Sequence, residues 1–499
     1  MGKCLGGNLG MPYEGREGPL ELKRDDVQRI SVPNDDLELQ MLWLWLIEKG
    51  GEKLRSADFA EAWDKWYQAD FDEYGVARWN IRRGLKPPLT GLHNNWFTDG
   101  MGAAIRSEIW ACLFPGKPDL AAAFAREDAC VDHAGEGIFA EVFLAAAESF
   151  AFVSGDLAKS INAGLVHIPD NSRVAQVVRF VGELWRQKIP VDRAREEILK
   201  KFGSHNFTDV CMNLGFIMLG LWYGEGEFEK SVLTAVNCGM DADCTAATTA
   251  AMLGILKGKR GIPEAWCDSV DDDLVYSPFL KELPLPRTIE EAVERTVVMA
   301  ERLSGMPSDK PLPNATLKSS EDRINDGHQW LVFRSPLDSG FLAEPECVRQ
   351  AQIDPSRFHK NLVEFSGIHM DLSSYIEKPG DTLYLLTWLL PCMEGEPAVS
   401  RFFQLMVCAD MTGITAWLDG EMIINYHGRR EMVPAFHRVE GGAVVPVDLR
   451  TDRRHLLRIR LLFCRKPLNL MVALADEHGR YLDGIKFCVN LQGKKDDGP

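Results

Sequence analysis

Two pairs of carboxylates stand at the start of two helical patterns that lie far apart in the chain. The first pair is Asp35 and Asp36, which precede an apolar run of helical spacing, and the second is Asp241 and Asp243, which precede a stretch made almost entirely of Ala and Thr. Small residues let a helix pack closely at the centre of a domain, and carboxylates buried there are costly unless a cation compensates their charge. Such oxygen ligands suit Mg²⁺, Mn²⁺ or Ca²⁺. The two pairs therefore predict a metal cluster at the point where both helix entries converge.

The first pair also has a purely structural interpretation. Asn34 is a predicted N-cap, and Asp35 and Asp36 would then complement the positive end of the helix dipole in the first turn. For this pair taken alone, the structural case is the commoner one. The second pair beside an Ala/Thr helix is what favours a cation.

The segment around GAAIR contains further candidate ligand-binding residues. Gly102 permits close approach of the backbone to a ligand, and Arg106 pairs either with an acid or phosphate of a ligand or with a structural carboxylate. Asn95 and Asp99 precede this stretch. We predict Asn95, Gly102 and Arg106 as substrate-binding residues and Asp99 as a candidate catalytic carboxylate.

Two more glycine-containing segments carry candidates. Asp132 and His133 stand beside glycines before an apolar helical pattern, where the histidine either lines a pocket or is a satisfied structural residue. We predict a substrate-binding role for both. Glu14 lies in the Gly/Pro loop LGMPYEG and is a second candidate acid or base.

Helices must position most of these residues, because apolar residues recur at helical spacing through residues 1 to about 305. Windows of this kind lie at 37–47, 121–124, 138–152, 174–184, 210–222 and 246–256. Gly and Pro separate these windows, as turns require. Residues 1–305 are therefore predicted to form an all-α domain.

The pattern changes after residue 305. Residues 306–322 are rich in Pro, Ser and charge and predict a linker. Residues 323–499 contain strand-like runs at 382–388 and 455–462 and a predicted hairpin at 415–424 with an Asp-Gly turn. Strands without intervening helices predict an antiparallel, jelly-roll-like β-sandwich, which makes the chain a multi-domain α and β protein. No acid pair at a helix entry and no Ser/His constellation occurs there, so we expect no catalytic group in it.

Composition limits the partners and the compartment. The 499 residues carry a net charge of −17, which argues against nucleic acid or an anionic membrane as a partner. The 12 cysteines form no C-x-x-C pair, which disfavours a Cys-rich zinc site and suits a reducing compartment. The opening residues contain no apolar run of signal-peptide length, and we expect a cytoplasmic protein. The sequence leaves a homo-oligomer open.

The order of the motifs resembles the ADP-ribosylglycohydrolase family over roughly residues 1–300. The shared features are, in order, L-G-x-P-x-E-G at 9–15, the D-D helix entry at 35–36, G-x-A-x-R at 102–106, the D-H turn at 132–133 and G-x-D-x-D at 239–243. The resemblance implies an orthogonal all-α bundle with a binuclear Mg²⁺ centre in a cleft. It also implies hydrolysis of a glycosidic bond at the anomeric carbon of ADP-ribose attached to protein side chains or small molecules.

Position by position, the resemblance assigns metal-binding roles to two triplets. Asn34, Asp35 and Asp36 match the first, with Asp36 also counted as catalytic, and Asp241, Asp243 and Cys244 match the second. Glu14 matches a family acid near the ligand and metals.

This chain departs from the family pattern at several of these positions. The family usually has Thr at the positions of Asn34 and Cys244, and frequently Asp at that of Gly7. Cys is a poor Mg²⁺ ligand, so either one site is altered or Thr245 supplies the hydroxyl.

The expected function is metal-dependent hydrolysis of an ADP-ribosyl or related ribosyl compound, small or protein-linked. One alternative is a hydrolase of another furanosyl or pyranosyl glycoside, favoured by the hairpin AWLDGE, which is similar to strands of carbohydrate-associated jelly rolls. Another is a non-catalytic nucleotide or sugar binder that has lost metal at the Cys244 position.

Overall fold

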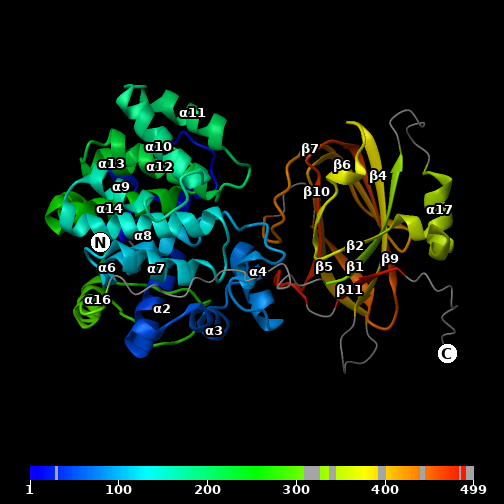
Figure 1. The fold of residues 1–499 in the computed structure, drawn as a ribbon, viewed down its shortest axis with the longest axis horizontal. Helices are drawn as coiled ribbons and strands as arrows, with labels where there is room; N and C mark the ends of the chain where they lie inside the picture. Colours follow the sequence, from blue (N-terminus) through cyan, green and yellow to red (C-terminus); the bar gives the residue numbers. More distant parts are fainter. Residues whose placement is uncertain are drawn as a thin grey trace. The chain divides into compact units, whose positions relative to one another are not determined.

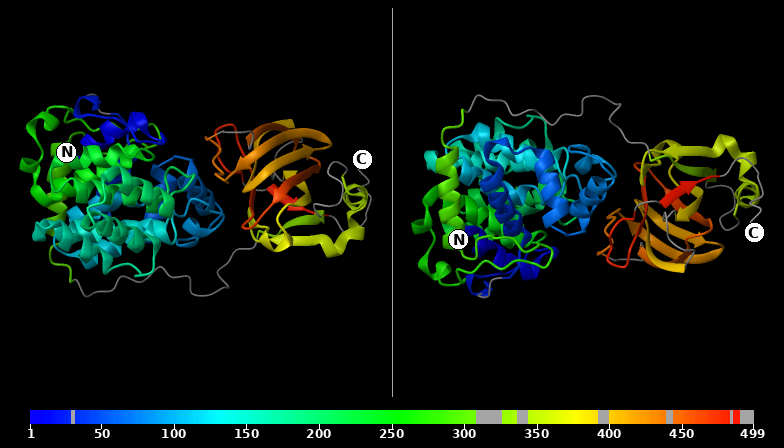
Figure 2. Two further views of the ribbon diagram at one scale, coloured as in Figure 1. Left: turned by 90° about the horizontal axis from the view of Figure 1, so that it is seen from above. Right: turned by 90° about the horizontal axis from the view of Figure 1, so that it is seen from below.

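The chain folds into a helical unit and a β-sheet unit, which can be followed from blue to red in Figure 1 and from two other sides in Figure 2. The computed structural model describes residues 1–28, 32–307, 326–335, 344–391, 400–438, 444–482 and 485–489. Most of the predicted linker, 306–322, lies outside these ranges. The first unit comprises Met1–Ala69, Asn80–Leu92 and Phe97–Lys318, and the second comprises Asp70–Trp79, His93–Trp96 and Ser319–Pro499.

The first unit is all-α, as the periodicity predicts, and each predicted helical window falls on a helix. Its helices are α1 (Gly2–Gly10), α2 (Asp35–Gly50), α3 (Ser56–Trp66), α5 (Leu89–Leu92), α6 (Ser107–Leu113), α7 (Pro118–Ala129), α8 (Glu136–Ser154), α9 (Leu157–Leu165), α10 (Arg173–Arg186), α11 (Val191–Phe202), α12 (Val210–Tyr223), α13 (Phe228–Val236), α14 (Ala242–Lys257), α15 (Glu264–Cys267) and α16 (Ile289–Leu303). Helix α4 (Asp72–Arg82) lies mainly in the second unit.

Helices α1 and α14 pack backbone against backbone. A Cβ at Gly6 would lie 2.4 Å from the carbonyl carbon of Ala246, and one at Gly10 would lie 2.3 Å from the carbonyl oxygen of Ala242. These distances are too short for any side chain, so glycine is required at both positions. The small residues of α14 complete the close contact and bring its acidic entry to the end of α1.

Helix α8 runs through the helical unit. By length and composition it is the one helix among the described residues that is long and apolar enough to cross a membrane. Most of its residues are buried within the protein, as in the core helix of a folded domain. Glu141 and Glu148 of α8 are also fully buried, which assigns this helix to the protein interior.

The second unit contains two antiparallel sheets, as predicted. Its described elements are β1 (His328–Ser335), α17 (Glu346–Ile353), β2 (Leu362–Phe365), β3 (His369–Asp371), β4 (Asp381–Pro391), β5 (Ser400–Ala409), β6 (Met411–Leu418), β7 (Glu421–Arg430), β8 (Val444–Arg450), β9 (His455–Cys464), β10 (Asn469–Ala475) and β11 (Ile485–Cys488). One sheet has the order β2-β1-β4-β9-β6-β7, with β11 paired to β4, and the other has the order β3-β10-β5-β8.

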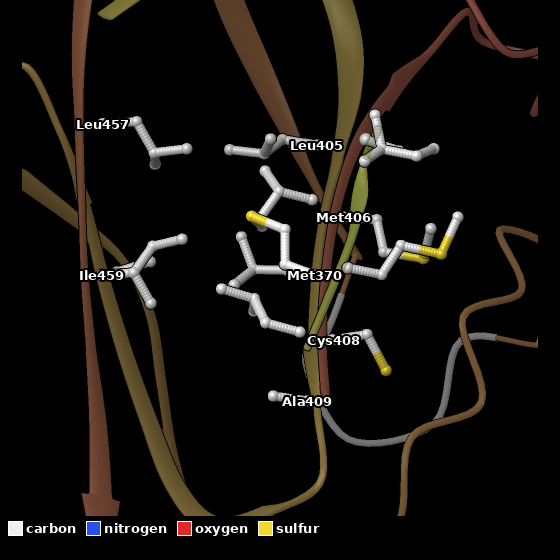
Figure 3. Close-up of a cluster of buried hydrophobic side chains, with 14 of the residues drawn as sticks. Met370, Leu405, Met406, Cys408, Ala409, Leu457 and Ile459 are labelled. Carbon is white, nitrogen blue, oxygen red and sulfur yellow. The ribbon is translucent and has the colours of Figure 1, made fainter. Parts of the chain in front are cut away.

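The core of this unit lies between the two sheets. Leu457 and Ile459 of β9 point toward Leu405 of β5 across the layer (Figure 3). Met406 and Cys408 point to the other face of β5 (Figure 3), and they are buried as well. Packing between the two sheets therefore accounts for the buried side chains on one face of β5. The burial of those on its other face requires contacts outside the space between the sheets.

The predicted hairpin is confirmed as β6 and β7. Leu418 pairs with Glu421 across the turn, and Asp419 and Gly420 adopt φ values of 49° and 91°. Two consecutive residues with positive φ are what a two-residue Asp-Gly turn supplies.

Two short segments of the N-terminal half belong to the second unit. Val76 and Trp79 of α4 are part of its hydrophobic core, and the indole of Trp79 stacks on Tyr481 with ring centroids 5.3 Å apart. In the segment 93–96, Asn94 Oδ1 accepts a hydrogen bond from the backbone N–H of Ile368 at 3.0 Å. The periodicity changes only after residue 305, so it does not predict that these two segments pack with the sheets.

We predict that Trp79→Ala destabilises the β-sheet unit by about 3–5 kcal/mol, because it removes a large side chain from a packed core. Unfolding in urea, followed by the near-UV signal of the second unit, measures the change. An unchanged unfolding midpoint would mean that α4 contributes no packing energy to the sheets.

Candidate metal centre

The two acid pairs converge at the entries of α2 and α14. Ligand atoms of Asp36, Asp243 and Cys244 lie within 4.8 Å of one another, and so do those of Glu14, Asp241 and Asp243. Asp243 belongs to both groups. The close approach of α1 to α14 is what brings Glu14, four residues beyond the end of α1, to the second group.

Asn34 begins helix α2 as the predicted N-cap. Its Oδ1 accepts a hydrogen bond from the backbone N–H of Asp36 at 2.7 Å. A Cβ at Gly7 would lie 2.7 Å from Asn34 Nδ2, so glycine at that position leaves room for the amide. Asn34 and Gly7 both depart from the family pattern, and the two residues are sterically compatible with each other.

The cluster contains buried oxygens without hydrogen-bond partners. Among the described residues, Asp241 Oδ1 and Asp243 Oδ1 have none, although these side chains are only 2% and 3% exposed. Burial raises the pKa of Asp241 to about 7, and the nearby Asp36 charge adds to the rise, against a lowering hydrogen bond with Cys244. Burial and the charge of Asp241 likewise raise the pKa of Asp243. A divalent cation would satisfy these oxygens, so the residues fit a metal site.

Lys3 of α1 reaches the same cluster. Its Nζ lies 3.3 Å from Asp36 Oδ2 and 2.8 Å from Glu108 Oε1 of α6. The Asp36 contact is an ion pair without hydrogen-bond geometry, since Oδ2 has no hydrogen-bond partner. Burial alone would lower the pKa of Lys3, but Asp36 and Glu108 outweigh it and raise that pKa, so the ammonium stays charged. In the sequence, Lys3 stands out as the one charged residue of a helix otherwise made of Gly, Cys, Leu and Asn.

The side chains that follow Asp243 have other partners. Cys244 Sγ donates to Asp36 Oδ1 at 3.4 Å, and burial together with the charge of Asp241 raises the pKa of its thiol. Thr245 Oγ1 donates to the carbonyl of Ala242 at 3.1 Å. The ligand roles of Cys244 and Thr245 both stay predictions.

Arg106 lies in a fully buried ion-pair network. Its guanidinium donates to both carboxylate oxygens of Asp132, at 3.0 and 2.9 Å, and lies 3.0 Å from Asp128 Oδ1. It also donates to the carbonyl of Gly102 at 2.6 Å. Burial opposes ionisation of Asp132, but Arg106 and His133 outweigh it and lower its pKa to about 2. These contacts match the structural interpretation of Arg106, and the substrate-binding roles of Gly102, Arg106, Asp132 and His133 stay predictions.

Asp99 and Asn95 lie on the loop before GAAIR. Asp99 Oδ1 accepts from Thr98 at 3.3 Å, and its Oδ2 lies 3.8 Å from Arg173, which lies equally far from Asp209. Burial raises the pKa of Asp99, and that of Asp209 to about 6. Asn95 is buried and belongs to the second unit. These contacts place Asp99 with Arg173 and Asp209, and its catalytic role stays a prediction.

The fold and the site define a helical domain whose buried carboxylates could hold a cation, followed by a unit of two antiparallel sheets. Residues 1–305 match the family model described as ADP-ribosylglycohydrolase, and the chain belongs to that family. Its members are hydrolases that act on ADP-ribose linkages.

The chain is also similar to individual proteins. An uncharacterized protein of Archaeoglobus fulgidus is 26% identical over 304 residues, covering 57% of this chain and 92% of the relative. A solved structure titled ADP-ribosylglycohydrolase-related protein complex is 17% identical with a TM-score of 0.39, covering 61% of this chain and 95% of its own. Another, a PA14 sugar-binding domain from RTX adhesin, is 15% identical with a TM-score of 0.19, covering 33% and 96%.

Proposed function

We propose that the protein is a metal-dependent hydrolase that cleaves the glycosidic bond at the anomeric carbon of ADP-ribose, or of a related ribosyl compound, linked to a small molecule or a protein. The observation that carries this proposal is the convergence of Glu14, Asp36, Asp241 and Asp243 at two helix entries. Asp35 lies beside Asp36 in the first turn of α2 and would complete the set.

Oxygen ligands of this kind would hold Mg²⁺, with Mn²⁺ or Ca²⁺ as the other hard ions that fit. When bound, such an ion supplies Lewis-acid stabilisation of charge that develops at the reacting centre, and it orients hydroxyl groups of the sugar.

The residues of the chain would hold the ion in place and transfer a proton. Asp241 and Asp243 are held by the N-cap and first turn of α14, whose backbone lies close to the glycines of α1. Glu14 is the exposed member of the cluster, so its carboxylate is accessible to substrate and water. One carboxylate oxygen of Glu14 would bind the ion, and we assign to the other the transfer of a proton to or from the water or the leaving group.

The test is release of ADP-ribose. Purified protein is incubated with ADP-ribosylated peptide, with a small ADP-ribosyl conjugate and with furanosyl and pyranosyl glycosides, each with Mg²⁺ or with EDTA. The proposal requires Mg²⁺-dependent release of free ADP-ribose. Turnover of simple glycosides alone would point to another glycosidase, and metal-free binding without turnover would point to a binding protein.

Cation affinity should fall below pH 7. The Asp241 carboxyl has its pKa raised to about 7 in the metal-free protein and must lose its proton to bind an ion. Because the pKa of Asp243 is raised as well, each ion bound at pH 6 should release at least about one proton from these two carboxyls, with roughly tenfold or more weaker binding per pH unit below 7. Titration calorimetry at pH 6 and 8, in buffers with different heats of ionisation, measures both quantities. Equal affinity at the two pH values would contradict the raised pKa.

A further inference from the structure

The two ligand groups of the acidic cluster are not equivalent. The group Glu14, Asp241 and Asp243 offers only carboxylate oxygens, with Oδ1 of both aspartates buried and without hydrogen-bond partners among the described residues. The group Asp36, Asp243 and Cys244 contains a sulfur, which is a poor ligand for a hard cation.

Asp36 already faces a fixed cation. The ammonium of Lys3 lies 3.3 Å from Asp36 Oδ2 and is 7% exposed. The opposite oxygen, Asp36 Oδ1, accepts from the thiol of Cys244 at 3.4 Å. Both oxygens of Asp36 are thus in contact with groups of the chain itself.

Neighbouring side chains hold the ammonium in place. Lys3 Nζ donates to Glu108 Oε1 at 2.8 Å and to Thr248 Oγ1 at 3.3 Å. Gln40 Nε2 donates to the other oxygen of Glu108 at 2.9 Å. Lys3 therefore has three oxygen neighbours from α2, α6 and α14, and it is fixed beside Asp36.

We propose that the Lys3 ammonium takes the place of a second divalent ion at the Asp36–Asp243–Cys244 group, so that this chain binds one divalent ion, at Glu14, Asp241 and Asp243. A divalent cation at the Asp36–Asp243–Cys244 group would lie within a few ångströms of the Lys3 ammonium, a fixed positive charge that water does not screen. The proposal rests on the metal dependence stated under the proposed function.

The stoichiometry of Mn²⁺ binding tests this inference on the full chain. Removing Lys3 alone would leave Glu108 buried without its cation, which endangers folding. The decisive variant is therefore Lys3→Met combined with Glu108→Gln, which removes both charges and keeps the shapes. Glu108→Gln alone is the matched control, because it retains the ammonium beside Asp36.

Mn²⁺ is counted by equilibrium dialysis with elemental analysis, and paired ions are detected by electron paramagnetic resonance through their exchange coupling. We expect one ion per chain in the wild type and in Glu108→Gln, and two coupled ions in the double variant. Two ions in the wild type, or one in the folded double variant, would overturn the inference while leaving metal dependence intact. No ion in the wild type would overturn the proposed metal dependence as well.

Discussion

Asp243→Ala is expected to reduce kcat on an ADP-ribosyl substrate by about a thousandfold or more. Asp243 is the residue common to both ligand groups, so its loss removes a ligand from every arrangement of the centre. Charge stabilisation by a bound metal is worth several kcal/mol, and each 1.4 kcal/mol corresponds to about a factor of ten in rate. Steady-state kinetics on the substrate identified by ADP-ribose release measure the loss.

The same variant should remain folded. Without metal, the carboxylate of Asp243 is buried beside like charges, and removing it relieves repulsion. Its metal-free unfolding midpoint should therefore equal or exceed that of the wild type. Asp192→Ala, at the exposed first turn of α11, is the matched control and should retain wild-type activity. Near wild-type turnover by Asp243→Ala would remove this residue from the metal centre.

Arg106→Met is expected to destabilise the helical unit by about 3–5 kcal/mol, or to prevent its folding. The substitution leaves Asp128 and Asp132 buried without their cation, and an uncompensated buried charge is among the most costly single changes. Denaturant unfolding measures the free energy. Arg193→Met is the matched control, because its exposed ion pair with Glu196 should contribute less than about 1 kcal/mol.

This variant also distinguishes the two interpretations of Arg106. A structural arginine predicts loss of stability in the metal-free, substrate-free protein. A substrate-binding arginine predicts a normally stable variant with a raised KM. The second result would contradict the role that the buried network assigns.

The elements of this protein were largely predictable from local patterns. The N-cap at Asn34, the helical windows and the Asp-Gly hairpin depend on residues close together in the chain, so periodicity and turn chemistry suffice to predict them. The acid pairs could be identified as candidate ligands for a similar reason. Paired carboxylates at two helix entries are unusual whatever the surrounding fold.

The sequence by itself therefore determined the family, the fold class and the residue types of the candidate centre. Only the tertiary structure decided which of those residues meet. The pairing of Lys3 with Asp36, the enclosure of Arg106 by Asp128 and Asp132, and the packing of Trp79 with the β-sheets all depend on contacts across long stretches of chain. Such contacts follow from how helix faces and sheets exclude water together, because a buried charge needs a neighbouring counter-charge and no local pattern identifies which distant residue supplies it.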